Sequence, residues 1–591
     1  MSTIPETIGD KLTARAPGRH CLTGNEAIVR GALEAGVGFV SGYPGTPASE
    51  IGDIFRDISP DNGIQFEDSI NEKVALETAF TASLLGVRAL AAMKHLGLAY
   101  AGDPLGTIPY VGVNGGCVIV SGGDPGLLVS PNEQDQRYVA RMIHVPVFDP
   151  AGPQEALEMS RFAFSLSEQT SLPVLLRTTI QVNFARGIVT TGELPESRPR
   201  RAYHKSPRDH VPIPANARRM RKALAERILR AEGILAGSPF YPRFGKGKFG
   251  ILTCGAPLNY VIDAVEELGY REDTQVLYLG CVYPVPGQVL ESFLRDVESV
   301  LVVEELLPFA EESLKVKAQE TGFAGPIFGK ATGHLPELFA LDPDGVRRAI
   351  RSFVGGTPVL PKSRSGSEPA SPDTACGNEL LSPRPPVLCA GCSHRSAFLA
   401  VKLVLGDEPI YCNDIGCYTL GYGEPLESAD MLLCMGSSIT MASTASRLGY
   451  KNAVAYIGDS TFFHSGLPAL ANAVRKDDDI IVVVMDNQTV AMTGHQASYS
   501  VTGSQGDRAM SIEEVARSLG AKVRVVNPDE LGDIVPIVSE IAADSGVRVL
   551  VTQEICPLVA FRTGRLKKDK VYRIDRSRCR HCGHEGKSLY C

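Results

Sequence analysis

Two polar residues that follow short apolar runs are the first candidates for chemistry in this chain. Asp459 comes shortly after residues 453–457, and Asn487 shortly after residues 480–485, with one helix-length segment between the runs. Neighbouring parallel strands end at the sheet edge where ligands bind, so both side chains should face one point. A carboxylate, an amide oxygen and the Thr489 backbone carbonyl suit Mg²⁺, which also retains phosphates and water. The spacing therefore predicts a magnesium site.

The tripeptide at residues 458–460 has a simpler interpretation when taken alone. Asp459 and Ser460 are both common helix caps, so a turn followed by a capped helix would explain them. The second polar residue at a neighbouring strand end is what favours ligand binding over capping.

The elements that position these residues form an α/β chain of three doubly wound parallel-sheet domains. Short apolar, β-rich runs alternate with helix-length segments, which is typical of such sheets. A Pro- and Arg-rich connector and a Ser-, Pro- and Gly-rich linker separate the domains. The expected segments are a first domain at 20–190, a connector at 191–245, a second domain at 246–358, a linker at 359–386, a third domain at 387–562 and a short Cys-containing C-terminal tail at 563–591.

Composition and charge exclude several classes of protein. The chain has 591 residues, of which 44% are hydrophobic and 21% charged, as in an ordinary enzyme. A formal net charge of −8 without long Lys/Arg blocks argues against a nucleic-acid or membrane-surface partner. The polar N-terminus lacks a signal-peptide core, and no apolar stretch is long enough to span a membrane. We therefore expect a cytoplasmic location with no membrane partner.

Several longer motifs surround the predicted magnesium site. They are GDSTFFHSG at 458–466, MDNQTVAMTGHQ at 485–496, LCAGCSHR at 388–395, DIGCYTLG at 414–421 and CMGSSI at 434–439. Together they resemble the thiamine-diphosphate domain of indolepyruvate ferredoxin oxidoreductase α subunits. The resemblance implies a pyrophosphate-binding domain at 387–562 and a transketolase-C-like domain at 246–358. It places near thiamine diphosphate the residues Cys392, Ile415, Gly416, Cys417, Tyr418, Gly458, Ser460, Met492 and Thr493, and it makes His394 a catalytic candidate.

Other interpretations of these motifs stay open. The spacing of Cys389 and Cys392 would also suit a redox pair or a zinc site, although no second pair accompanies it at zinc-ribbon spacing. His464 and His495 are equally consistent with cofactor contact and with packing.

Thiamine chemistry also needs a carboxylic acid that hydrogen-bonds the aminopyrimidine ring and favours its imino tautomer. Glu72 is the candidate, near the start of a helix that continues to Leu85. Ser69 and Glu72 also match a capping box, in which the glutamate would only bond a backbone amide. The motifs NEKVALE at 71–77 and MKHLGL at 93–98 resemble the family's pyrimidine-binding domain, here residues 20–190, which implies the activating role for Glu72. Glu67 and Glu77 are the fallback candidates.

The resemblance extends to GNEA at 24–27 and GYPGTP at 42–47, and it implies that Thr46 lies near the substrate carbonyl or carboxylate. Thr46 followed by Pro47 would also suit a helix N-cap with proline at the first helical position. Residues 121–135 depart from the family's pattern. This departure concerns the substrate pocket rather than the cofactor site.

The cysteine tail determines how electrons would leave. The family carries two cysteine-rich iron–sulfur motifs after the thiamine domain, whereas this chain offers Cys579, Cys582, His584 and Cys591. A full cluster motif would have a third cysteine where Glu585 stands. A single [4Fe–4S] cluster, a Zn²⁺ site of cysteines with His584, a stub without metal and a truncated chain all stay open.

The resemblance implies a subunit that oxidatively decarboxylates a 2-oxoacid on thiamine diphosphate with Mg²⁺ and passes the acyl group to coenzyme A. An arylpyruvate such as indolepyruvate or phenylpyruvate is the expected substrate. The implied partners are a small β-type oxidoreductase subunit, in a dimer of heterodimers, and ferredoxin or another electron carrier. A non-oxidative thiamine-dependent decarboxylase or carboligase, favoured by the short tail, and a non-catalytic assembly subunit are the alternatives.

Overall fold

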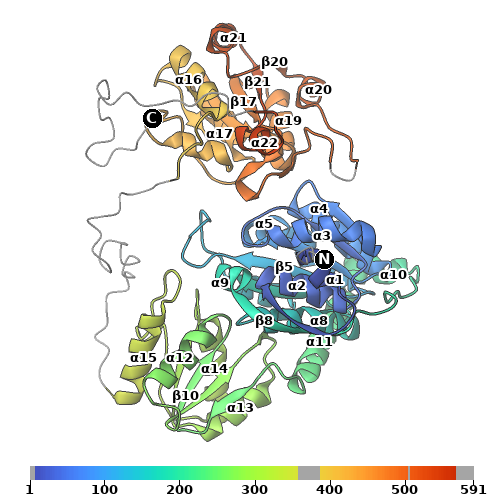
Figure 1. The fold of residues 1–591 in the computed structure, drawn as a ribbon, viewed down its shortest axis with the longest axis vertical. Coiled ribbons are helices and arrows are strands. Elements are labelled where there is room, and N and C mark those ends of the chain that lie inside the picture. The colour runs from blue at the N-terminus through green and yellow to red at the C-terminus, as the bar shows by residue number, and fades with distance from the viewer. Residues whose placement is uncertain (1–6, 357–385, 504–505, 567–591) are drawn as a thin grey trace, which may run out of the picture. The chain divides into compact units, whose positions relative to one another are not determined.

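The computed structural model describes residues 7–356, 386–503 and 506–566, which fall into an N-terminal and a C-terminal compact unit (Figure 1). Each unit is built from mainly parallel sheets with helices packed on them. The predicted α/β class with several parallel-sheet domains is therefore confirmed. The cysteine tail from residue 567 onward lies outside the described residues.

A seven-stranded sheet forms the first part of the N-terminal unit. Its strand order is β12-β6-β7-β5-β4-β2-β3, and only the edge strand β12 runs antiparallel to its neighbour. The strands are β2 (Phe39–Gly42), β3 (Gln65–Asp68), β4 (Ala89–Lys94), β5 (Cys117–Gly123), β6 (Val147–Phe148), β7 (Val174–Thr179) and β12 (Cys281–Tyr283). The chain around the sheet includes α2 (Gly24–Glu34), α3 (Ser49–Asn62), α4 (Glu72–Leu84), α5 (His95–Tyr100), α7 (Gln136–Ile143) and α8 (Pro153–Thr170). Strands β5 and β7 are buried along their whole length, as expected of parallel strands covered on both faces.

The long helix α11 (Pro214–Ala236) leads into a second, five-stranded sheet of the same unit. Its order is β14-β13-β10-β11-β9, with β9 antiparallel. The strands are β9 (Arg243–Gly245), β10 (Phe249–Thr253), β11 (Thr274–Tyr278), β13 (Ser299–Val303) and β14 (Ile327–Phe328), and the helices are α12 (Pro257–Glu267), α13 (Gly287–Asp296), α14 (Phe309–Thr321) and α15 (Pro343–Gly355). Strand β12 follows β11 in sequence but pairs with β6 of the first sheet, so the chain crosses from the second sheet back to the first.

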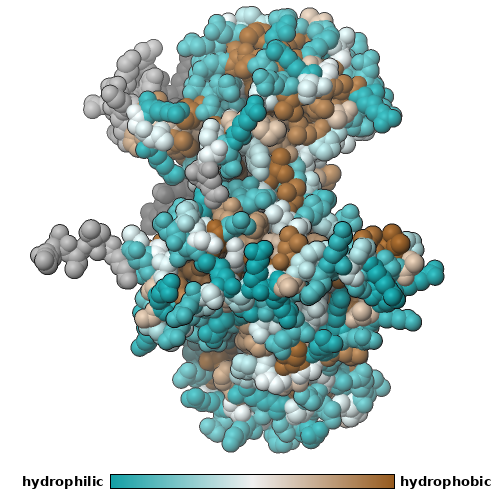
Figure 2. All heavy atoms as spheres, turned by 90° about the vertical axis from the view of Figure 1, so that its right-hand side faces the viewer, coloured by the Kyte–Doolittle hydropathy of each residue, from teal (hydrophilic) through white to brown (hydrophobic). Residues whose placement is uncertain are grey.

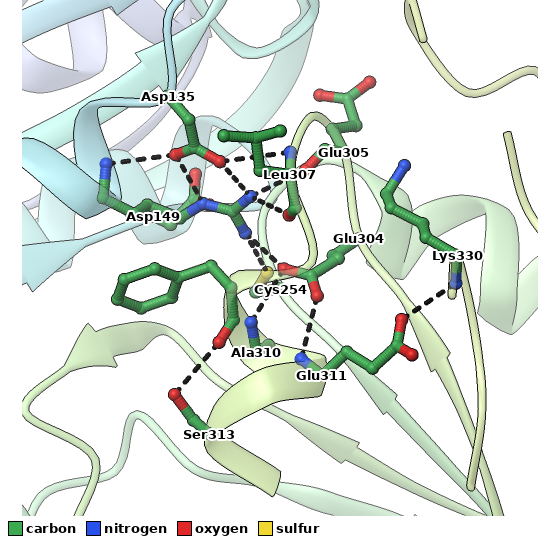
Figure 3. Close-up of polar contacts among 12 residues, drawn as sticks. Asp135, Asp149, Cys254, Glu304, Glu305, Leu307, Ala310, Glu311, Ser313 and Lys330 are labelled. Carbon is green, nitrogen blue, oxygen red and sulfur yellow. Dashed lines mark hydrogen bonds and ion pairs between the residues drawn. The ribbon is translucent and has the colours of Figure 1, made fainter. Parts of the chain in front are cut away.

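A buried charge network lies where the two sheets of the N-terminal unit meet (Figure 3). Arg137 of α7 ion-pairs with Asp135 at 2.5 Å and with Glu304, just after β13, at 2.6 Å. Glu304 also accepts hydrogen bonds from the backbone amides of Ala310 and Glu311, both at 2.9 Å. Buried charges are tolerated when they are paired and hydrogen-bonded in this way. The network therefore joins the two sheets.

The C-terminal unit contains one five-stranded, all-parallel sheet of order β15-β16-β17-β21-β20. The strands are β15 (Tyr411–Cys412), β16 (Ala453–Gly458), β17 (Ile480–Asp486), β20 (Lys522–Val526) and β21 (Val547–Gln553). The main helices are α16 (Ser393–Leu405), α17 (Ser437–Arg447), α19 (Leu467–Arg475) and α21 (Leu531–Ala543). Strands β16 and β17 lie side by side and are buried throughout, which places their carboxyl ends together.

Hydrophilic side chains cover most of the molecular face shown in Figure 2, with smaller hydrophobic groups between them. Among the described residues, no helix combines the length and the apolar character that crossing a membrane requires.

Candidate functional site

The two predicted metal ligands lie at adjacent strand ends in the C-terminal unit. Gly458 of β16 pairs with Met485 of β17, so Asp459 and Asn487 follow neighbouring strand ends. Both residues are buried, as is Thr489 of the short strand β18 (Thr489–Val490). The Asn487 side-chain oxygen accepts a hydrogen bond from the Thr489 amide at 3.3 Å. One carboxylate, one amide oxygen and the backbone around Thr489 thus gather in one region.

A second buried carboxylate, Asp486, accompanies Asp459. The Ser500 hydroxyl bridges them, 2.8 Å from Asp486 Oδ1 and 3.4 Å from Asp459 Oδ2, and Gln553 donates to Asp486 Oδ2 at 2.8 Å. Burial, reinforced by the charge of Asp486, raises the pKa of Asp459 to about 8. Within the described ranges, neither aspartate forms an ion pair with a basic side chain. Without a cation, burial and the charge of Asp486 therefore favour a proton on Asp459, and a hard cation would replace that proton and neutralise the ionised pair.

The donor set fits magnesium better than a transition metal. No group of three or more His, Cys, Asp or Glu side chains is placed to hold a metal in the part of the chain that the structure describes. Mg²⁺ does not need such a group, because it takes one or two carboxylates and completes its shell with water and phosphate oxygens.

Two predicted glycines allow a tyrosine ring to pack between the cofactor loops. A Cβ added to Gly416 would lie 2.5 Å from a Tyr418 ring atom, and one added to Gly458 would lie 2.3 Å from it. The Tyr418 hydroxyl donates to the Ile415 carbonyl at 2.8 Å and contacts the Thr461 hydroxyl at 2.7 Å. Tyr418 thus ties the loop after β15 to the loop after β16.

A pocket of about 130 Å³ opens beside these loops within the C-terminal unit. Its lining includes four predicted residues, Cys392, His394, Cys417 and Asn487. The amino-terminal end of α16 supplies Cys392 as the helix N-cap and His394 from the first turn. The structure therefore brings together predicted site residues from three separate motifs.

His394 is a neutral imidazole in this pocket. It is buried, and burial lowers its pKa to about 4. Its ring lies edge-on to Tyr418 with the centroids 6.1 Å apart. A neutral ring can donate or accept a hydrogen bond at neutral pH but carries no charge.

The predicted activating glutamate lies in the N-terminal unit. Glu72 is the first residue of α4 and is 5% exposed. The helix cap is Asn71, whose side chain accepts from the Val74 amide at 2.9 Å, so the capping-box interpretation of Ser69 and Glu72 is wrong. The Ser69 hydroxyl instead donates to Glu67 at 2.8 Å.

A close helix contact confines the Glu72 side chain. Gly97 of α5 lies so near that an added Cβ would come within 2.3 Å of Glu72 Cγ and 2.5 Å of Oε1. The fallback candidates lie in different environments. Glu77 is half-buried and ion-paired with Lys73, and Glu67 is half-buried beside Ser69. Of the three glutamates, only Glu72 is buried.

Thr46 lies in a loop across the ends of β4 and β5. Helix α3 begins at Ser49 with Ala48 as its N-cap, so the N-cap interpretation of Thr46 is wrong. A Cβ on Gly45 would lie 2.6 Å from Lys94 Cβ, and Asn25 donates to the Pro47 carbonyl at 2.9 Å. The motifs at 24–27 and 42–47 are thus one structural feature, in which Asn25 holds the loop that presents Thr46.

Comparison with known proteins agrees with this geometry. Residues 30–181 match the family described as "Pyruvate flavodoxin/ferredoxin oxidoreductase, thiamine diP-bdg", and residues 414–552 match "Thiamine pyrophosphate enzyme, C-terminal TPP binding domain". The chain is 39% identical to indolepyruvate oxidoreductase subunit IorA of Methanothermobacter marburgensis, over 97% of this chain and 92% of that protein. It belongs to the IorA family.

Other relatives extend the comparison. The IorA protein of Pyrococcus abyssi is 39% identical, over 95% of this chain and 90% of its own length. A solved 2-oxoglutarate:ferredoxin oxidoreductase from Magnetococcus marinus is 17% identical with a TM-score of 0.46, covering 57% of this chain and 65% of that one. The family and the two thiamine-domain matches confirm the prediction of a thiamine-diphosphate-dependent 2-oxoacid oxidoreductase α subunit.

Two residues of this IorA-family site were missed in the sequence. Asp414 is fully buried and accepts hydrogen bonds from the Gly436 and Ser438 amides, at 2.8 and 3.0 Å, at the start of α17. Cys556 lines the pocket, and its amide donates to the Asn487 carbonyl at 3.0 Å. Asp414 is the first residue of the motif at 414–421. Cys556 follows the strand expected at 547–551, so its position after a strand end is the signal that could have identified it.

The structure does not bring every predicted residue into the pocket. Met492 is 52% exposed, and the Thr493 hydroxyl donates to the Gln496 side chain at 2.7 Å. Their neighbours Ala491 and His495 line the pocket instead. The tail candidates Cys579, Cys582, His584 and Cys591 lie outside the described residues.

Proposed function

We propose that this IorA-family chain oxidatively decarboxylates an arylpyruvate, such as indolepyruvate or phenylpyruvate, to the acyl-coenzyme A. The observation that carries the proposal is the buried Asp459–Asp486 pair beside Asn487 at adjacent strand ends, which suits a metal diphosphate. The arylpyruvate assignment is supported by the name indolepyruvate oxidoreductase, which relatives that match nearly the whole chain carry.

The C-terminal unit would hold the polar end of the cofactor. Asp459, the Asn487 side-chain oxygen and the Thr489 carbonyl would bind Mg²⁺. The backbone at Gly458 and Ser460 would bind the diphosphate, because amides at the start of a helix favour anions. The pocket beside the diphosphate would be lined by the uncharged side chains of Cys392, Cys417 and neutral His394. Such a lining excludes water, which strengthens electrostatic interactions within the site.

The N-terminal unit would act on the other end. When bound, thiamine diphosphate supplies an acidic carbon that attacks the oxoacid carbonyl and accepts the electrons left by loss of CO₂. Glu72 would hydrogen-bond the aminopyrimidine ring, and Gly97 would keep the carboxyl group in place. Thr46 would donate a hydrogen bond to the substrate. The two sets of residues lie in different units of the chain.

The reaction also needs partners. A small β-type subunit, in a dimer of heterodimers, would complete the enzyme, with coenzyme A as co-substrate. Electrons would pass to ferredoxin or another carrier, through a [4Fe–4S] cluster if the tail binds one. A Zn²⁺ ion at Cys579, Cys582, His584 and Cys591 would instead leave electron transfer to the partner.

The test is anaerobic purification of the chain with its small subunit, followed by iron and zinc analysis and product identification from phenylpyruvate. Phenylacetyl-coenzyme A formed only with coenzyme A and an electron acceptor is the expected result. Release of phenylacetaldehyde by an iron-free preparation would instead favour the non-oxidative alternative. Glu72→Gln should lower kcat by roughly 100-fold or more, with Glu77→Gln, which changes the half-buried partner of Lys73 on the same helix, as control.

A further inference from the structure

Lys94 is a sheltered cation in the N-terminal unit that no carboxylate neutralises. It is the last residue of β4 and is half-buried. Its ammonium donates to the Val129 carbonyl at 2.9 Å, and within the described ranges it forms no ion pair. Asp124, the acid whose charge acts on Lys94, accepts from the amides of Leu128 and Val129 at 3.3 and 2.7 Å. The carboxylate of Asp124 is therefore engaged with its own loop.

The buried arginines of this unit are neutralised, and buried Lys330, although it forms no ion pair within the described ranges, interacts with the charges of Glu304, Glu305 and Glu311. Arg137 pairs with Asp135 and Glu304, Arg177 with Asp149 at 2.6 Å, and Arg30 with Glu34 at 2.9 Å. Burial lowers the pKa of Lys94 to about 8, partly opposed by Asp124. A charge sheltered without a counterion costs stability, which makes its retention informative. An anionic ligand would supply the missing counterion.

The surroundings of Lys94 indicate which anion this is. Lys94 is the N-cap of α5, and Gly97, which touches Glu72, lies one helical turn further on. On its other side, the loop that carries Thr46 packs its Gly45 against Lys94. Lys94 is thus next to the helix that confines the activator candidate and next to the loop that carries the substrate-contact candidate.

We propose that the Lys94 ammonium binds the carboxylate of the 2-oxoacid. This inference rests on the proposed function, because it takes Glu72 and Thr46 as active-site residues. The cofactor diphosphate is the other anion at such a site, but its expected ligands lie in the C-terminal unit. Lys94 would therefore hold the acid group that leaves as CO₂ and select oxoacids over aldehydes.

The test compares Lys94→Met, Lys94→Arg and the exposed control Lys222→Met in the complete enzyme with its small subunit. For Lys94→Met, KM for phenylpyruvate should rise about 10- to 100-fold, the size of one charge-assisted hydrogen bond. Lys94→Arg should recover part of this loss, because it keeps the charge. The Kd of thiamine diphosphate and the rate of hydrogen–deuterium exchange at its reactive carbon should not change, because neither involves the substrate.

Several outcomes would overturn the proposal. An unchanged KM in Lys94→Met would show that the ammonium does not hold the substrate. Weaker thiamine-diphosphate binding with normal KM would make Lys94 a cofactor contact. If the wild-type enzyme turns over no oxoacid, the proposed function fails, and the Kd of phenylpyruvate for the thiamine-loaded enzyme still tests Lys94. A Kd that is about 10- to 100-fold higher in Lys94→Met than in the wild type would support the proposal. Equal Kd values, or no binding to the wild type, would contradict it.

Discussion

The sheet junction of the N-terminal unit and the strand ends of the C-terminal unit both bury carboxylates, but they treat the charge differently. At the junction, Asp135 and Glu304 share Arg137 (Figure 3). Arg137 lowers the pKa of Asp135, although burial opposes the shift. At the strand ends, Asp459 and Asp486 have no such partner among the described residues, and the pKa of Asp459 is raised. At the junction Asp135 and Glu304 thus have a counterion within the protein, whereas at the strand ends Asp459 and Asp486 have none among the described residues and are left for a ligand.

The largest effect should come from Asp459→Ala. Affinity for thiamine diphosphate with Mg²⁺ should fall at least about 100-fold, since loss of even the outer partners of metal ligands costs about 10- to 100-fold. The cofactor-free protein should be no less stable, because the change removes a buried carboxyl group whose ionisation is opposed by burial and by Asp486. Titration calorimetry and thermal unfolding measure the two quantities.

The matched control is Asp478→Ala, near the opposite end of β17, where the carboxylate pairs with Arg447 at 2.6 Å. This control should keep cofactor affinity. Retained affinity in Asp459→Ala, or a large drop in its stability, would contradict the contrast between the two regions.

The next effect concerns the junction. Arg137→Met would leave Asp135 and Glu304 buried without a counterion, which should lower the free energy of unfolding by about 3–5 kcal/mol. Arg295→Met breaks an exposed pair with Glu291 and should cost no more than about 1 kcal/mol. Denaturant unfolding measures both variants. Equal losses would mean that the buried network does not join the sheets.

A smaller effect should follow from Gly97→Ala. The added methyl group would displace Glu72, and a shift of about 1 Å can lower a rate up to about 100-fold. We expect kcat to fall 10- to 100-fold with the Kd of thiamine diphosphate little changed. Gly102→Ala in α6 (Gly102–Val111) is the control, because no atom lies within 4 Å of its added Cβ. If Gly97→Ala had the same kcat as the wild type, Glu72 would not be the residue that activates the cofactor.

The smallest expected effect is a pH dependence from Lys94, which is faced by Asp124 and His95. The ammonium is protonated below its pKa of about 8, and the neutral amine above it cannot bind a carboxylate. Therefore kcat/KM for the oxoacid should fall about tenfold per pH unit above this pKa. Lys94→Arg should remove the decline, because arginine stays charged. A wild-type profile that matches the arginine variant would argue against carboxylate binding by Lys94.

Local patterns predicted much of the fold and part of the candidate site. The α/β class followed from the alternation of apolar runs and helix-length segments. Asp459 and Asn487 could be paired because parallel strands joined by one helix end at the same edge. The capping assignment of Ser69 failed because the helix begins two residues later than that motif requires, with Asn71 as the cap that accepts from the Val74 amide, and a short motif does not distinguish between the two starts.

The sequence by itself determined the fold class, the family resemblance and the strand-end position of the predicted metal ligands, because these depend on periodicity and contiguous motifs. Only the tertiary structure decided which charges are neutralised. Arg137 and Glu304 are far apart in the chain yet paired, whereas Lys94 and Asp124, closer in sequence, are not. Long-range packing sets these distances. Charge left for a ligand therefore becomes visible only once the chain is folded.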